Sequence, residues 1–151
     1  MKRTPLSLAA LLLILAAFTP LGLAFFTNEI TSSASLSYTN AAKGIATTAL
    51  SSPPSFFTIT GYNVVNSTMN VPTTAGGTAI PLGSVGTLGW SYFKNIDATN
   101  YVDIMTATSG TAYVRLLPHE FAMFRFTPAI TAPAALAHTS TVLMQYMIIE
   151  N

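Results

Sequence analysis

Cysteine is absent from the 151-residue chain, so disulfides, thiol catalysis and thiolate-based zinc sites are excluded. Charge is also scarce, because Asp, Glu, Lys and Arg make up only 7% of the residues, against about 25% in a typical soluble domain. The net charge is +1, and no block of like charges occurs, which argues against a nucleic-acid-binding surface. Beyond residue 28, no window of helical periodicity exceeds about two turns.

Apolar and hydroxyl side chains take the place of charge. Half of the residues are hydrophobic, and the chain contains 22 Thr and 13 Ser. Such a composition excludes a solvated, disordered chain, which needs low hydrophobicity and high net charge. Threonine is β-branched and suits a pleated, half-buried surface, so the composition indicates one compact, β-rich domain.

The N-terminal segment has a character of its own. Two basic residues precede an apolar run over 6–18, and Gly22 and Ala24 place small residues at positions −3 and −1 of a possible cleavage. This layout predicts a hydrophobic helical segment over 1–24 that acts as a secretory signal peptide. Two alternatives stay open: an uncleaved membrane anchor over 6–26, and a misplaced translation start. Membrane contact is expected only through 1–26, and only if the segment is uncleaved.

The remainder, 25–151, reads as short strands separated by turn residues, which predicts a single antiparallel β-sandwich of jelly-roll-like type. Turns are expected at 97–100, 109–110 and 118–120, where Asp, Asn, Gly and Pro gather. A loop is expected at 51–54, because Pro53 and Pro54 remove two ladder donors. A break is expected near Asn66, between strands over 56–65 and 68–71, and a Pro/Ala-rich connection over 128–137 leads to a last strand over 141–149. Strands are further expected over 29–38, 90–96, 101–105, 111–116 and 121–126.

Three segments carry a resemblance. Residues 89–102 read G-W-S-Y-F-K-N-I-D-A-T-N-Y-V, residues 116–125 read L-L-P-H-E-F-A-M-F-R, and residues 146–150 read Y-M-I-I-E. In this order they resemble the hairpins and closing strand of small tailed-phage structural proteins. The resemblance implies a β-sandwich packed into a virion as a minor capsid, head-fibre or tail component, without catalysis. The chain departs from that pattern at His119, which stands where the turn has glycine, and in its signal-like N-terminus.

Candidate catalytic residues are few: His119, His138, Asp97, Asp103, Glu120 and the hydroxyls. No G-x-S-x-G elbow and no phosphate-binding G-x-x-x-x-G-K-[ST] loop occurs. Asp97 is interpreted as a turn cap and Asp103 as a solvated strand residue, rather than as a carboxylate pair. The two histidines are interpreted as solvent-facing, since two His without a fixed spacing are weak support for a metal site. No enzyme activity, metal or cofactor is predicted.

The leading hypothesis is therefore a non-enzymatic virion structural protein that assembles with copies of itself and with other virion proteins. The alternative is an exported bacterial adhesin or carbohydrate-binding module, located outside the cell through the signal-like segment. The isolated domain is not expected to be a stable monomer, because few charges protect its strand edges. Structural or assembly roles are assigned to Trp90, Tyr92, Phe93, Asp97, Asn100, Tyr101, Phe124, Phe126 and Tyr146.

Overall fold

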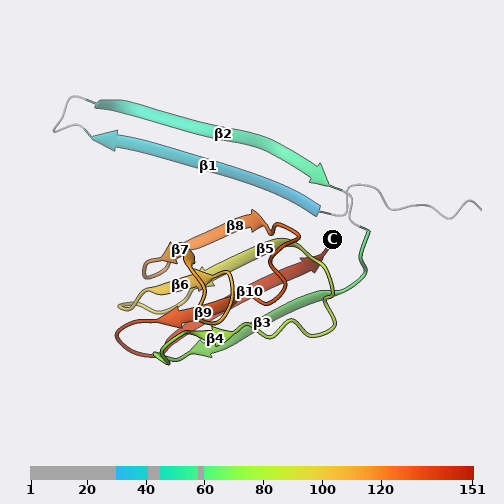
Figure 1. The fold of residues 1–151 in the computed structure, drawn as a ribbon. Coiled ribbons are helices and arrows are strands. Elements are labelled where there is room, and N and C mark those ends of the chain that lie inside the picture. Colours follow the sequence, from blue (N-terminus) through green and yellow to red (C-terminus); the bar gives the residue numbers. More distant parts are fainter. Residues whose placement is uncertain (1–29, 41–44, 58–59) are drawn as a thin grey trace, which may run out of the picture. The chain divides into compact units, whose positions relative to one another are not determined.

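A computed structural model describes residues 30–40, 45–57 and 60–151, and its regular structure in these ranges consists of β-strands (Figure 1). The all-β prediction is confirmed for this part of the chain. The helical segment expected over 1–24 lies outside the described residues. Within the described ranges, no helix has the length and apolar character needed to cross a bilayer.

The chain divides into two units, residues 1–58 and 59–151, and the first contains a two-stranded antiparallel ribbon. Strand β1 (Ile30–Asn40) pairs with β2 (Ile45–Phe57). The predicted loop at 51–54 is wrong, because β2 continues through it. Ser52 lies opposite Ala34 and Ser55 opposite Ser32, so Pro53 and Pro54 fall where the register shifts. A β-bulge tolerates prolines there, because its extra residue needs no ladder hydrogen bond.

The second unit is a sandwich of two four-stranded antiparallel sheets. One sheet has the order β3-β10-β5-β8 and the other β4-β9-β6-β7. In the first sheet β3, the first strand of the unit, lies beside β10, the last. In the second sheet β4 lies beside β9 in the same way, and β6 and β7 form the innermost hairpin. This nesting is the jelly-roll topology. The strands are β3 (Val64–Val71), β4 (Thr78–Ala79), β5 (Leu88–Asn95), β6 (Val102–Met105), β7 (Ala112–Leu116), β8 (Phe121–Arg125), β9 (Ala134–Ala137) and β10 (Val142–Glu150).

The core of the sandwich is built from the inward-facing residues of both sheets. Burial alternates along β5 and β10 with the two-residue period of a strand. Phe93 on β5, Ile104 on β6, Ala135 on β9 and Tyr146 on β10 belong to one continuous buried cluster. A single core therefore joins the two sheets.

Most of the predicted strands and turns after residue 88 are confirmed, whereas the strand boundaries expected over 56–71 and the connection expected over 128–137 are wrong. Strand β3 runs through Asn66 without a break; Asn66 is exposed and lies at the edge of its sheet, where a polar side chain needs no buried partner. The expected connection over 128–137 contains β9, whose alanines lie buried between β4 and β6. Alanine has low strand propensity, and packing between neighbouring strands overrides it here.

Candidate functional site

The turn after β5 is held by the carboxylate of Asp97. Its Oδ1 accepts hydrogen bonds from the backbone N–H of Asn100 at 2.7 Å and of Thr99 at 2.8 Å. These bonds hold the pKa of Asp97 below its ordinary value, and the bond from Asn100 has the largest effect. An Asp side chain that binds the N–H groups two and three residues ahead closes a tight turn without further partners. The interpretation of Asp97 as a turn cap is confirmed.

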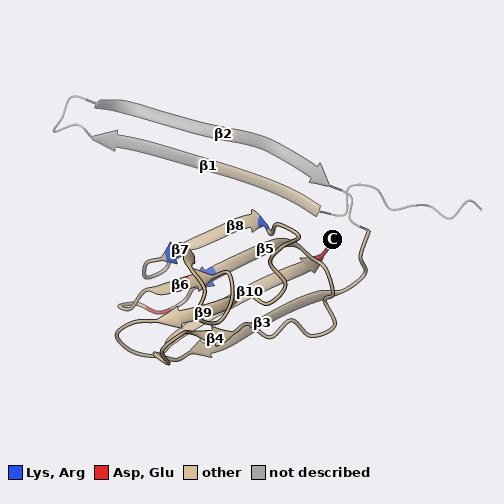
Figure 2. Ribbon diagram, in the orientation of Figure 1, with Lys and Arg blue, Asp and Glu red and all other residues tan. Residues whose placement is uncertain are grey.

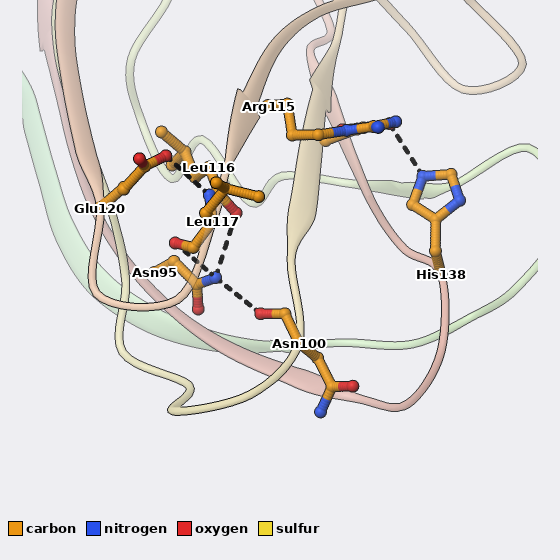
Figure 3. Close-up of polar contacts among 8 residues, drawn as sticks. Asn95, Asn100, Arg115, Leu116, Leu117, Glu120 and His138 are labelled. Carbon is orange, nitrogen blue, oxygen red and sulfur yellow. Dashed lines mark hydrogen bonds and ion pairs between the residues drawn. The ribbon is translucent and has the colours of Figure 1, made fainter.

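Asn95 ties this turn to the opposite sheet. Its side chain is fully buried, and its Nδ2 donates to the carbonyls of Asn100 at 2.8 Å and of Leu116 and Leu117 at 3.1 Å (Figure 3). Its Oδ1 accepts the N–H of Asp97 at 2.9 Å. One amide thus connects β5, the 97–100 turn and the end of β7. The sequence alone did not assign this role, although Asn95 lies in the 89–102 segment that carries the resemblance.

The turn between β7 and β8 is closed by Glu120 in a similar way. Its Oε2 accepts the backbone N–H of Leu117 at 2.8 Å (Figure 3). His119 in the same turn has a φ of 66°, a left-handed conformation that costs a non-glycine residue free energy. The turn therefore has the geometry for which glycine is suited, although histidine occupies the position. Glu120 therefore closes its own turn.

A buried carboxylate, Asp103 on β6, forms the main polar cluster of the sandwich. Arg115 on β7 binds it through Nε at 2.7 Å and Nη2 at 2.8 Å, and Nε2 of His138 lies 2.8 Å from its Oδ2. The side chain of Asp103 is 4% exposed, whereas those of Arg115 and His138 are 54% and 33% exposed. The interpretation of Asp103 as a solvated residue is therefore wrong. His119 and His138 are both exposed, as interpreted, but His138 is also bonded to Asp103.

The physical reason for this burial lies in the pairing of the strands. Asp103 is directly opposite Arg115 in the β6–β7 ladder, so the two side chains meet on one face of the sheet. The hydrogen bonds from Arg115 contribute most to lowering the pKa of Asp103. A buried carboxylate that receives a bidentate guanidinium stays ionised.

Tyr101 covers the same cluster. Its ring is stacked on the imidazole of His138 with 4.7 Å between centroids, and the guanidinium carbon of Arg115 lies 4.3 Å from the centre of the tyrosine ring. These are cation–π and stacking contacts. The assignment of a structural role to Tyr101 agrees with this packing, although its role in assembly stays a prediction.

The Asp103–His138 pair has the residue types of two members of a hydrolase triad. A triad requires a nucleophile bonded to the other ring nitrogen of the histidine. Among the described residues, the hydrogen bonds give His138 a single partner, Asp103. Both oxygens of Asp103 are also bonded to Arg115, which orients the carboxylate toward the ion pair. This geometry is that of a strand-to-strand connection.

The sequence suggested two further groupings, a carboxylate pair of Asp97 and Asp103 and a metal site of His119, Glu120 and His138. Asp97 and Asp103 are bonded to separate partners, one to its own turn and one to Arg115 and His138. Within the described ranges, no group of three or more His, Asp or Glu side chains is placed to hold a metal ion.

Glu150 at the end of β10 binds the backbone of two loops, one at 62–63 and one at Gly86. The sequence alone did not predict this role. Oε2 of Glu150 accepts N–H bonds from Tyr62 and Asn63, and its Oε1 accepts the N–H of Gly86 at 2.9 Å. These bonds lower the pKa of Glu150, and the bond from Gly86 has the largest effect. A Cβ at Gly61 would overlap Cγ of Glu150, so this position favours glycine. The final glutamate of the Y-x-I-I-E segment was the available signal.

Apart from Tyr101, the aromatic residues assigned to structural roles occupy two environments. The first is the core, where Phe93 is stacked on Phe124 at 5.6 Å and on Tyr146 at 6.4 Å, and contacts Phe126 edge-on at 6.1 Å. The hydroxyl of Tyr146 donates to the carbonyl of Pro81, and burial raises the pKa of Tyr146. Edge and offset contacts of this kind add to the stability supplied by burial.

The second environment is the outer face of the β3-β10-β5-β8 sheet. Tyr92 lies opposite Met123 on β8 and Met147 on β10, and its ring is stacked on Phe121 at 5.8 Å. The side chains of Phe121 and Met123 are 65% and 40% exposed. Trp90 has the same orientation in the alternation of β5. We call this surface, formed by Trp90, Tyr92, Phe121, Met123 and Met147, the outer aromatic face.

Charge is sparse around this face. Figure 2 shows few charged positions on the strands of the sandwich. Lys94 is paired with Phe121 and Arg125 with Trp90 in the β5–β8 ladder, so the two charges on these strands are both positive. The outer aromatic face is thus an apolar surface with basic residues at its margin.

The chain matches no protein-family model, and no curated protein and no solved structure is similar enough to count as a match.

Proposed function

We propose that the protein is a non-enzymatic structural component of a phage virion, which acts by packing its sandwich against neighbouring subunits. The single observation that carries the proposal is the outer aromatic face. Large apolar side chains, led by Phe121 at 65% exposure, lie together on one sheet. Contiguous exposed apolar surface is characteristic of interaction sites, and aromatic residues and methionine are enriched in the cores of interfaces.

The polar residues support the same reading. Asn95, Asp97, Asp103, Glu120 and Glu150 each hold a turn, a loop or a neighbouring strand. Four of these five residues, all but Asp103, lie in the segments that resemble phage structural proteins, so these segments supply most of these connections. Jelly rolls occur in viral capsid proteins, and also in lectins, so the fold is compatible with the alternative of an exported carbohydrate-binding module.

The occupant proposed for the outer aromatic face is a different surface of another virion subunit. Two copies of this face would bring Lys94 and Arg125 toward the same residues of the partner, and like charges in an interface are unfavourable. A partner surface with apolar and acidic residues fits better.

The test is mass spectrometry of purified particles from cells that produce the chain, combined with two single variants. Phe121→Ser should reduce incorporation into particles strongly, while the thermal stability of the isolated protein changes little. Leu117→Ser is the matched control, because Leu117 is an exposed apolar residue at 48% on the β7–β8 turn rather than on this face. Absence of the wild-type chain from particles, together with binding to glycans, would replace the proposal by the adhesin alternative.

A further inference from the structure

The two strands of the ribbon present very different outer edges. Both register shifts of the β1–β2 ladder place one more residue in β2 than in β1: Pro53 and Pro54 face Ser33, and 46–47 face Thr39. Strand β2 is thus bulged twice and carries two prolines. Bulges and prolines are devices that blunt an edge against further pairing.

The edge of β1 carries none of these devices. Its sequence, ITSSASLSYTN, contains no proline and no Asp, Glu, Lys or Arg, so it also lacks the charges that usually protect an edge. Strand β1 is eleven residues long. Among the described strands β2 is its one neighbour, so its other edge has no partner strand in the described part of the chain. An uninterrupted, uncharged edge of this length is a template for another strand.

The ribbon also requires additional contacts. An isolated two-stranded hairpin is marginally stable in water, and three or more strands are needed for independent stability. Addition of strands at β1 would supply them, whereas addition at β2 would meet the bulges and prolines.

We infer that β1 pairs antiparallel with β1 of a second copy, which produces a four-stranded sheet of order β2-β1-β1-β2 across a twofold axis. The occupant is a second copy for two reasons. The uncharged sequence brings no like charges together when it pairs with itself, and a sheet closed by two blunted β2 edges stops at two chains rather than growing into a fibre. This pairing rests on the proposed function, because a protein that acts by assembly is expected to meet further copies of itself.

The geometry of this pairing can be tested by disulfide formation, because the chain has no cysteine of its own. Ser35 is the middle residue of β1, so a twofold axis through the centre of the strand places it opposite itself. Directly opposed residues in an antiparallel pair have Cα atoms about 4.5–5.5 Å apart, within the range that a disulfide bridges.

Ser51 provides the matched control. It lies opposite Ser35 in the ribbon, and both side chains are exposed. In the proposed sheet, however, the two copies of Ser51 are separated by three strand spacings, about 14 Å. Mild oxidation of the full chain should therefore give a covalent dimer as the main product with Ser35→Cys, and no such product with Ser51→Cys.

Three results would overturn the inference. The first is equal cross-linking of Ser35→Cys and Ser51→Cys. The second is the absence of cross-linking throughout a cysteine scan of Thr31, Ser33, Ser35, Ser37 and Thr39. The third is loss of the Ser35→Cys dimer on adding Phe121→Ser, which would show that the sandwich holds the copies together. If the dimer persists while Phe121→Ser lowers incorporation into particles, both proposals are supported separately. If the dimer persists and incorporation is unchanged, the proposed function alone is refuted.

Discussion

Replacement of Asp103 by asparagine removes the charge at the centre of the polar cluster while it keeps the shape of the side chain. Asp103 accepts two hydrogen bonds from Arg115 and is bonded to His138, all at 2.7–2.8 Å. A hydrogen bond to a charged group contributes about 1.5–3 kcal/mol to stability. Asparagine keeps one acceptor oxygen, and the 54% exposed Arg115 side chain regains water when the pair is broken. We therefore expect Asp103→Asn to lower the free energy of unfolding by about 2 kcal/mol.

The measurement is urea and thermal unfolding followed through the fluorescence of Trp90, the one tryptophan of the chain. A loss of about 2 kcal/mol corresponds to a decrease in Tm of about 10 °C for a unit of this size. Arg115→Gln should cost much less in the Asp103→Asn background than in the wild type, because the two residues act as a pair. A loss below about 0.5 kcal/mol, the range of an ordinary surface substitution, would refute the reasoning.

The pH dependence provides a second check on the same cluster. Folding lowers the pKa of Asp103, so its contribution to stability is present above the unfolded pKa of about 3.9 and is lost as the pH falls through the folded pKa. The difference in stability between wild type and Asp103→Asn should therefore be constant near neutral pH and disappear in acid. A difference that persists at low pH would mean that the charge of Asp103 does not carry the effect.

Further substitutions test other joints of the sandwich. Asn95→Leu should lower the unfolding free energy by about 1–3 kcal/mol, because it leaves buried carbonyls without a donor; a neutral result in urea unfolding would contradict the role given to this amide. His119→Gly should raise Tm, because glycine adopts the left-handed φ of 66° without strain, and a lower Tm would speak against strain in this turn. Phe93→Ala should cost about 3–5 kcal/mol, and a soluble variant of wild-type stability would rule out its place in the core. Glu150→Gln should destabilise the protein at neutral pH and lose its effect in acid, since folding lowers the pKa of Glu150. Thermal unfolding followed by circular dichroism at several pH values measures this effect, and an effect that does not change with pH would contradict the prediction.

The sequence predicted well where the chain carries its own local signals. The turn at 97–100 was readable because Asp97 bonds to the backbone two and three residues ahead. The burial of Asp103 could not be predicted from the sequence, because its partners lie 12 and 35 residues away and meet it only through strand pairing. Strand β9 was missed because its alanines carry no strand signal of their own and are placed by β4 and β6.

The same distinction applies to the ribbon and to the interaction surface. Pro53 and Pro54 predicted a loop, and only the register of the pairing shows that a bulge accommodates them. The strand expected over 121–126 is confirmed as β8. The sequence did not show that Phe121 meets Tyr92, because the order of strands in a sheet is a property of the whole fold.

The position of β10 in the sheet has a consequence for the order of folding. This strand lies between β3 and β5, and it pairs with both along most of its length. Its pairing with β3 joins residues about eighty positions apart, and contacts of such separation slow folding because a long loop must close first. During synthesis, the sandwich cannot close until residue 150 has left the ribosome. Until then β3 and β5 expose the edges that β10 later covers, so the nascent chain is most prone to aggregation just before β10 has emerged.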